Sequence, residues 1–173
     1  MHQLLLNEAI YENLVSKHLA SVHKFLWIVT ADIKDMYIES AGNFIPLLQL
    51  LAELIDNGVA VRLVHAKEPG PRFREEFDRF PQLLESELFE RILCPRVHTK
   101  CIVIDGCLAF VGSANLTGAG LGAKHKDKRN FEAGFLFDDI NQIQALMNWV
   151  DQLYLGEFCL DCRLRTICPD PIA

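Results

Sequence analysis

The chain of 173 residues has no apolar run near the ~20 residues that a membrane-spanning helix requires. It also lacks a signal-peptide pattern at its start, because Asn7, Glu8 and Glu12 interrupt the apolar residues there. Low-complexity segments, long linkers and obvious repeats are missing too. We therefore expect a soluble cytoplasmic protein with no transmembrane segment.

An excess of positive charge is also missing, since 17 Lys and Arg stand against 23 Asp and Glu, a formal net charge of −6. This balance disfavours a protein that coats nucleic acid by charge alone. The positive charge that exists is clustered in one loop, at Lys124, Lys126, Lys128 and Arg129. We expect these four residues to bind the phosphates of a substrate; the alternative is an ordinary solvated loop.

Apolar periodicity predicts alternating helices and strands. The expected elements are a helix over 3–22, a strand over 24–30, a helix from Asn43, a strand over 59–65, a helix over 73–89 broken near Pro81, strands over 91–112, a strand over 131–137 and a helix after Asp138 or Asp139. Asn43 is the expected N-cap of its helix, with Pro46 in the first turn, and Gly58 ends that helix. The strands on either side should be parallel neighbours, as in a β-α-β unit.

These elements together predict an α/β fold, a mixed β-sheet flanked by helices. We expect a catalytic domain over residues 1–155 and a Cys-rich C-terminal tail over 156–173.

Cysteines are numerous, with six in the chain. Cys101 and Cys107 fall inside apolar strand patterns and are interpreted as small buried side chains. The tail contains Cys159-x2-Cys162-x5-Cys168, and Cys94 is a candidate fourth member of the set. Such clustered thiols predict a structural zinc ion or an iron–sulfur cluster, while a redox disulfide or free thiols remain alternatives.

The segment from Val97 to Asn115 has the pattern of a β-hairpin with Asp105-Gly106 at its turn. Side chains alternate along a strand, so His98 and Lys100 project from one face. A two-residue turn pairs Ile104 with Cys107, which predicts that His98 lies opposite Ser113 and Lys100 opposite Val111.

The open end of this hairpin has the composition of a phosphate site. Lys100, Ser113 and Asn115 can donate hydrogen bonds to phosphate oxygens. His98 can attack phosphorus or transfer a proton. Asp105 lies inside the turn and should hold the hairpin rather than contact a substrate.

The pattern His98-x-Lys100-x4-Asp105-x6-Gly112-Ser113-x-Asn115 matches the HKD motif of the phospholipase D superfamily at every fixed position. The later segment Asn130-Phe131-Glu132 resembles the strand that follows in that family, whose acidic residue steadies the catalytic histidine. The resemblance covers roughly residues 25–155. It implies a phospholipase D-like fold with a catalytic set of His98, Lys100, Asp105, Ser113, Asn115 and Glu132.

The resemblance also implies the chemistry, a two-step phosphodiester cleavage through a phosphohistidine that needs no cofactor for catalysis. One histidine attacks, and a second histidine protonates the leaving group. Larger members of the family carry two motifs, whereas this chain carries one, so the second histidine should come from another subunit of a homodimer. In this respect the chain is similar to small single-motif bacterial endonucleases.

A nuclease acting on DNA or RNA is therefore the first hypothesis. The alternatives are a phospholipid hydrolase or transphosphatidylase, which would favour an exposed apolar rim, and a nucleic-acid-binding module without catalysis. The intact set of motif residues disfavours the binding module.

Overall fold

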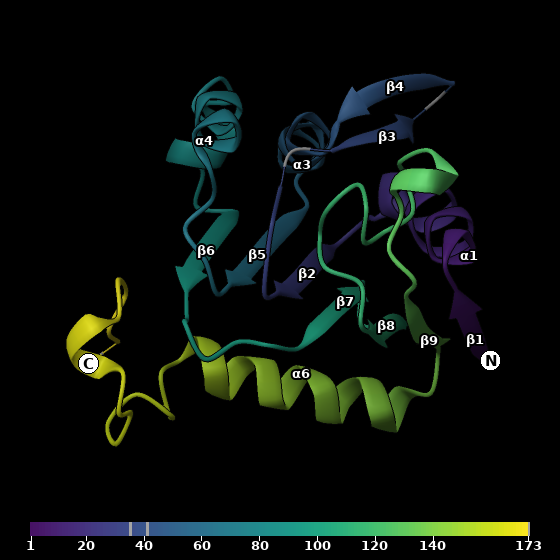
Figure 1. Ribbon diagram of the computed structural model, residues 1–173. Coiled ribbons are helices and arrows are strands. Elements are labelled where there is room, and N and C mark those ends of the chain that lie inside the picture. Colours follow the sequence, from purple (N-terminus) through teal and green to yellow (C-terminus); the bar gives the residue numbers. More distant parts are fainter. Residues whose placement is uncertain (35, 41, 173) are drawn as a thin grey trace.

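The computed structural model describes residues 1–34, 36–40 and 42–172, and its central feature is a mixed seven-stranded sheet with helices on both faces (Figure 1). The strands lie in the order β1-β9-β8-β7-β2-β5-β6. Their bounds are β1 His2–Leu6, β2 Phe25–Thr30, β5 Ala60–His65, β6 Phe89–Leu93, β7 Lys100–Ile104, β8 Leu108–Gly112 and β9 Ala133–Phe137. β2, β5 and β6 are parallel, and the other pairs are antiparallel. The predicted α/β class is confirmed. No helix in the described ranges is long and apolar enough to span a membrane.

The predicted β-α-β unit is present, with α3 (Leu47–Asp56) between the parallel strands β2 and β5. Gly58 ends the unit's helix with a positive φ of 83°. The start of this helix differs from the prediction, because Asn43–Pro46 forms β4, which pairs with β3 (Tyr37–Ser40). Pro46 disfavours helical backbone in the residue before it, so the chain stays extended until the proline.

The N-terminal segment also differs from the prediction of one helix over 3–22. His2–Leu6 forms β1, which pairs with the edge of β9, and the side chain of Leu5 is buried in the hydrophobic core. Asn7, with a positive φ of 50°, separates this strand from helical turns. The turns are α1 (Glu8–Ile10), a π-helical turn (Tyr11–Val15), α2 (Ser16–His18) and a 3-10 turn (Leu19–Ser21). Pairing with an open strand edge overrides the helical pattern of the first residues.

Side chains alternate between the two faces of the sheet, and each face carries a hydrophobic core. On one face, α3 and the N-terminal turns pack on residues such as Ile28, Leu63 and Phe110. On the other face, α6 (Ile140–Tyr154) packs through Ile143 and Val150 on sheet residues such as Val103 and Val29 (Figure 1). Asp139 caps α6, as one of the two predicted positions, by accepting a 2.9 Å hydrogen bond from Gln142 N.

The predicted helical break near Pro81 is confirmed, since α4 (Pro71–Phe77) and α5 (Gln82–Glu85) lie on either side of it.

His65, at the end of β5, is fully buried and hydrogen-bonded on both ring nitrogens. Its Nε2 accepts from Arg91 Nε at 2.9 Å, so Nδ1 carries the proton that is donated to Lys67 O at 2.8 Å. Burial, followed by the charge of Arg91, lowers the pKa of His65. The imidazole is therefore a neutral structural link between β5 and β6.

The neutral state of His65 predicts a pH-dependent stability. The pKa is lower in the folded state than the ~6.5 of the unfolded chain, so the unfolded state binds the proton first and stability falls as pH drops below that value. His65→Gln should lower the free energy of unfolding at pH 8 by about 1–3 kcal/mol. It should also reduce the loss of stability between pH 8 and pH 5, measured by urea unfolding. Equal losses in mutant and wild type would contradict the assignment.

Candidate active site

The β7–β8 hairpin carries the motif, and its register differs from the prediction by one residue. Cys107 N donates to Ile104 O at 3.0 Å, but Ile104 pairs with Leu108, so Lys100 lies opposite Gly112 rather than Val111. Cys107 is the extra residue, and its side chain is exposed rather than buried as predicted. The shift lets Leu108 and Phe110 point into the core, and burial of one face decides a register. By contrast, Cys101 is buried as predicted, and burial raises the pKa of its thiol to about 12.

His98 and Lys100 meet at the open end of the hairpin. His98 lies just before β7 with an exposed side chain, whereas the Lys100 side chain is 8% exposed and donates from Nζ to His98 O at 2.6 Å. Both line a cleft of about 420 Å³ together with Ser113. A lysine held this way places a positive charge in the same cleft as an accessible imidazole.

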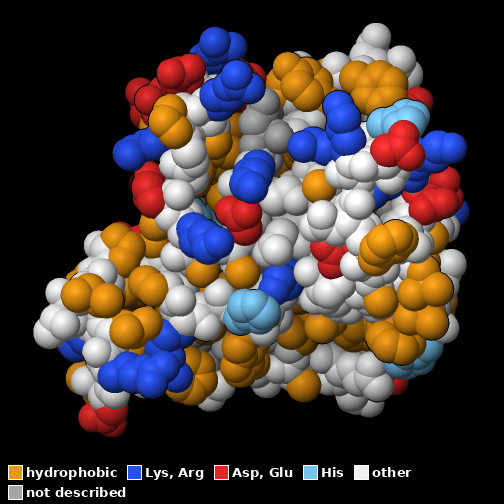
Figure 2. Space-filling model, viewed as in Figure 1, with side chains coloured by type: hydrophobic (Ala, Val, Ile, Leu, Met, Phe, Trp, Pro, Cys, Tyr) orange, Lys and Arg blue, Asp and Glu red, His pale blue; other side chains and the backbone are white. Residues whose placement is uncertain are grey.

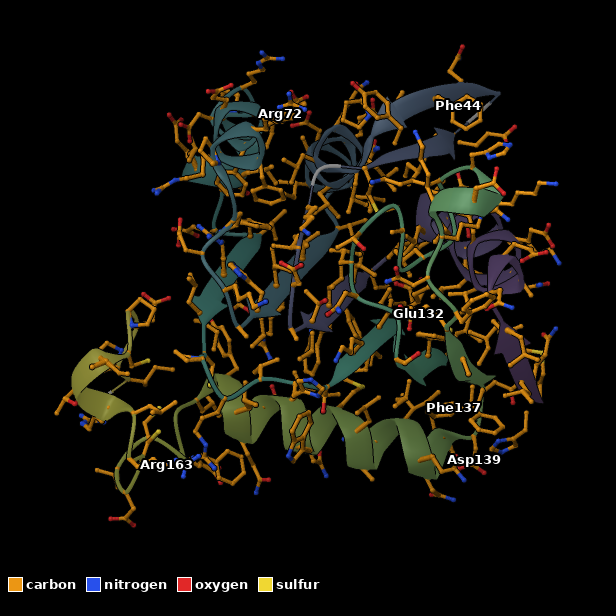
Figure 3. The ribbon with its side chains drawn as sticks, in the orientation of Figure 1. Phe44, Arg72, Glu132, Phe137, Asp139 and Arg163 are labelled. Atoms are coloured by element: carbon orange, nitrogen blue, oxygen red, sulfur yellow. The ribbon has the colours of Figure 1, made fainter. Side chains whose placement is uncertain are left out.

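Ser113, which lines the cleft, is hydrogen-bonded to Glu132, whose position Figure 3 labels. Ser113 Oγ donates to Glu132 Oε2 and accepts from Ala133 N at 3.1 Å. Asn130 Nδ2 donates to the other carboxylate oxygen at 3.1 Å. The resemblance implies that Glu132 steadies His98, but among the described residues His98 donates no hydrogen bond to this carboxylate. The carboxylate instead fixes the hydroxyl of Ser113.

Asn115 is held at the end of β2 by a residue that the sequence analysis missed. Its Oδ1 accepts from Asp32 N at 3.0 Å, and Thr30 Oγ1 lies 3.3 Å away. Thr30 Oγ1 also accepts from Leu116 N at 3.0 Å and is 1% exposed. Asn115 therefore lies at the end of β2 with Oδ1 engaged, and it is not among the residues that line the cleft. A polar residue ending the apolar strand β2 was the available signal for Thr30.

Two facing glycines let the Phe110 ring pack beneath the cleft. A Cβ atom at Gly112 would lie 2.6 Å from Ala133 O and 2.7 Å from the Phe110 ring, and one at Gly134 would lie 2.4 Å from the same ring. The motif glycine is therefore required by packing. It also leaves the cleft floor beside Lys100 open.

The basic loop lies elsewhere. Lys126–Lys128 forms a 3-10 turn above α1 (Figure 1), and none of the four basic residues of this loop lines the described cleft. Arg129 instead forms an ion pair with Glu8 in α1, with 3.8 Å between Arg129 Nη1 and Glu8 Oε2. A substrate-binding role for Lys124, Lys126, Lys128 and Arg129 stays a prediction.

A separate groove beside α4, of about 610 Å³, is lined by Lys34 and Arg72 and also by Asp32, whose carboxylate lies 3.4 Å from Lys34 Nζ. Figure 2 shows Lys and Arg side chains gathered on this face of the molecule.

The predicted metal ligands converge without forming a site. Cys94, Cys159, Cys162 and Cys168 all line one cavity of about 290 Å³, which His98 also borders. Within the described ranges, no three His, Cys, Asp or Glu side chains are arranged to hold an ion.

Asp105 lies in the turn, where both Asp105 and Gly106 have positive φ. Its carboxylate accepts backbone hydrogen bonds from His23 at 3.0 Å, Lys24 at 2.7 Å and Phe25 at 3.0 Å. Burial alone would raise the pKa of Asp105, but these three donors lower it. The carboxylate thus ties the hairpin to the start of β2 and does not line the cleft, as the sequence analysis expected.

Replacing this carboxylate tests the structural role of Asp105. Asp105→Ala should lower the free energy of unfolding at neutral pH by about 1–3 kcal/mol, because three N–H groups lose their acceptor. The contribution is present above the unfolded pKa of ~3.9 and is lost as pH falls through the lower folded value. Urea unfolding checks both statements, with the exposed Asp161→Ala as the control. An unchanged stability would contradict this role.

A family model described as cardiolipin synthase, PLD-like domain, matches residues 15–154. The chain belongs to the phospholipase D superfamily. That membership places it among phosphodiesterase-type enzymes. A comparison with curated protein sequences found no match.

Solved structures share the fold at low sequence identity. NucT from Helicobacter pylori is 13% identical with a TM-score of 0.64, over 88% of this chain and 94% of that one. Nuc, a phospholipase D family member from Salmonella typhimurium, is 15% identical with a TM-score of 0.61, over 88% and 93%. Phosphatidylserine synthase from Haemophilus influenzae is 16% identical with a TM-score of 0.62, over 90% of this chain but 38% of that chain.

Proposed function

We propose that this protein is a metal-independent nuclease that cleaves phosphodiesters through a phosphohistidine and acts as a homodimer. The observation that carries the proposal is one cleft lined by the exposed imidazole of His98, the buried ammonium of Lys100 and Ser113. An accessible nucleophile in the same cleft as a fixed positive charge is what attack on an anionic phosphate requires.

The reaction proceeds in two balanced steps. A ring nitrogen of His98 forms a bond to phosphorus while the bond to the leaving oxygen breaks, and that oxygen takes a proton from the second copy's histidine. Water then gives its proton to that histidine and forms the new P–O bond, and the N–P bond breaks. Lys100, which lines the cleft, stabilises the charge on the phosphate oxygens in both steps, so the proposed catalysis needs no metal ion.

A second copy of the chain would complete this site. The chain has one motif, and His98 is the histidine lining the cleft among the described residues. Beside the cleft, β1 and β9 expose an apolar surface that contains Leu4 (53% exposed), Leu6 (52%) and Phe135 (53%). Leu4 pairs with Phe135 across the two strands, so the surface is continuous. A twofold dimer that buries this surface would bring two clefts together.

Nucleic acid is the favoured substrate class. The chain matches almost the whole length of NucT and Nuc but 38% of the phosphatidylserine synthase chain. The groove with Lys34 and Arg72 also gives an extended phosphate backbone positive side chains to contact beyond the scissile bond.

A phospholipid is the second candidate substrate. The exposed Leu4, Leu6 and Phe135 form an apolar rim of the kind that a lipid-cleaving enzyme would use at a membrane surface. Substrate assays separate the two candidates directly.

The first test is turnover in excess EDTA. Purified protein should cleave a single-stranded oligonucleotide, DNA or RNA, and His98→Ala should reduce the rate at least ~10³-fold, because it removes the nucleophile. His23→Ala, an exposed histidine outside the cleft, is the control. Cleavage of phosphatidylcholine vesicles without nuclease activity would favour the lipid candidate. Full activity of His98→Ala would sink both.

The second test is the molecular mass in solution. Phe135→Asp and Leu6→Asp should each convert a dimer into monomers in light-scattering measurements. Each variant puts a charge into the apolar surface that the dimer would bury. Phe44→Asp is the matched control, since Phe44 is 69% exposed on β4, remote from β9 (Figure 3). A monomeric wild type that retains full activity would exclude the shared site.

A further inference from the structure

The C-terminal tail folds back against the end of β6, where Cys94 lies. Leu93 N donates to Asp170 Oδ2 at 2.7 Å, and Cys168 Sγ lies 3.9 Å from Leu93 O. These two contacts bring the last cysteine of the tail next to Cys94, although the two are far apart in the sequence. Figure 1 shows the tail beside the end of β6 and the end of α6.

The other two tail cysteines are held on the same cavity by short turns. Cys162 N donates to Cys159 O at 3.2 Å, and Arg165 Nη1 donates to Cys159 O at 3.2 Å and to Ile172 O at 2.9 Å. The guanidinium of Arg165 thus joins the beginning and the end of the tail by hydrogen bonds to both. All four thiols consequently line one wall or another of a single cavity.

Hydrophobic burial does not account for this fold of the tail. None of the described residues from 156 to 172 is buried, and Leu160 and Ile167 are 76% and 72% exposed. A segment that buries so little apolar surface needs another source of stability to remain ordered. Small elements without a core commonly obtain it from a disulfide or a structural metal ion.

We infer that Cys94, Cys159, Cys162 and Cys168 bind one structural zinc ion that fastens the tail to the end of β6. Four thiolates with a C-x2-C pair form a closed tetrahedral zinc site. The spacing x2 then x5 differs from the C-x2-C-x2-C and C-x4-C-x2-C patterns of ferredoxin clusters, which favours zinc over an iron–sulfur cluster.

Binding of the ion exchanges protons for zinc. Four thiols release four protons, and the zinc tetrathiolate carries a net charge of −2. Arg96 and Arg165, which both line the cavity, lie where they can compensate this charge. The sulfurs are not yet arranged for coordination in the structure. All four cysteines are half-buried, and rotation of their side chains would bring the sulfurs to about 2.3 Å from the ion.

The site would also order the segment that leads to the nucleophile. Cys94 accepts a 2.9 Å hydrogen bond from Val97 N, and His98 follows directly and borders the same cavity. Zinc at Cys94 would therefore fix the start of β7, a positioning role rather than a catalytic one. The inference does not depend on the proposed nuclease activity.

The test measures metal content, which is separate from activity. Full-length protein, purified without chelator under reducing conditions, should contain one zinc per chain by elemental analysis. Cys94→Ser and Cys162→Ser should each lower zinc affinity at least ~10-fold, since loss of even an outer partner has this effect. Cys107→Ser, in the exposed hairpin turn, is the matched control and should keep the zinc.

Cobalt substitution is measured on the wild-type protein, so its result does not depend on whether a cysteine variant folds. A thiolate-to-cobalt charge-transfer band with tetrahedral d–d absorption supports the site. Zinc-free protein with four free thiols, disulfides among these cysteines by peptide mapping, or bound iron with sulfide would each overturn the inference.

Discussion

The carboxylate of Asp105 connects the two parts of the fold that build the site. It accepts the N–H groups of His23, Lys24 and Phe25, and so fixes the start of β2 against the turn of the β7–β8 hairpin. Because β2 and β7 then run side by side, the far end of β2 reaches the open end of the hairpin, and Thr30 can hold Asn115 there. Asp105 is remote from the cleft, yet it fixes the hairpin whose open end carries Lys100 and Ser113 in the cleft lining.

Packing beneath the hairpin sets the rest of the geometry. The Phe110 ring fills the space beside Gly112 and Gly134, the two glycines that pair across β8 and β9. This packing fixes β9, and Glu132 is the residue that directly precedes β9. Asn7 holds the backbone of Glu132 by two hydrogen bonds. Glu132 N donates to Asn7 Oδ1 at 3.1 Å, and Asn7 N donates to Glu132 O at 2.8 Å. The carboxylate is thus positioned by the first turn of the chain and in turn holds Ser113.

Much of this arrangement could be predicted from the sequence, because it depends on local patterns. The β-α-β unit, the hairpin turn and the motif spacing all follow from periodicity and from residues with special backbone preferences. The role of Asp105 could also be predicted, since a carboxylate in a tight turn faces backbone donors. The fold class and the superfamily followed from these features.

Other features depended on tertiary contacts that the sequence does not display. The register shift at Cys107 comes from burying Leu108, and β1 forms because β9 offers an open edge. The hydrogen bond of Glu132 to Ser113 rather than His98, and the position of the basic loop above α1, were likewise set by packing across the chain. In each of these cases a competing local pattern was overridden by burial or strand pairing.

The central claim is that His98 becomes covalently attached to phosphorus during turnover. The most direct measurement is rapid quenching of the protein with a labelled oligonucleotide at alkaline pH, where phosphohistidine survives, followed by mass mapping of the peptide that contains His98. The account predicts a nucleotide adduct on His98 that forms and decays at rates compatible with turnover. Turnover without any adduct, or an adduct on another residue, would contradict it.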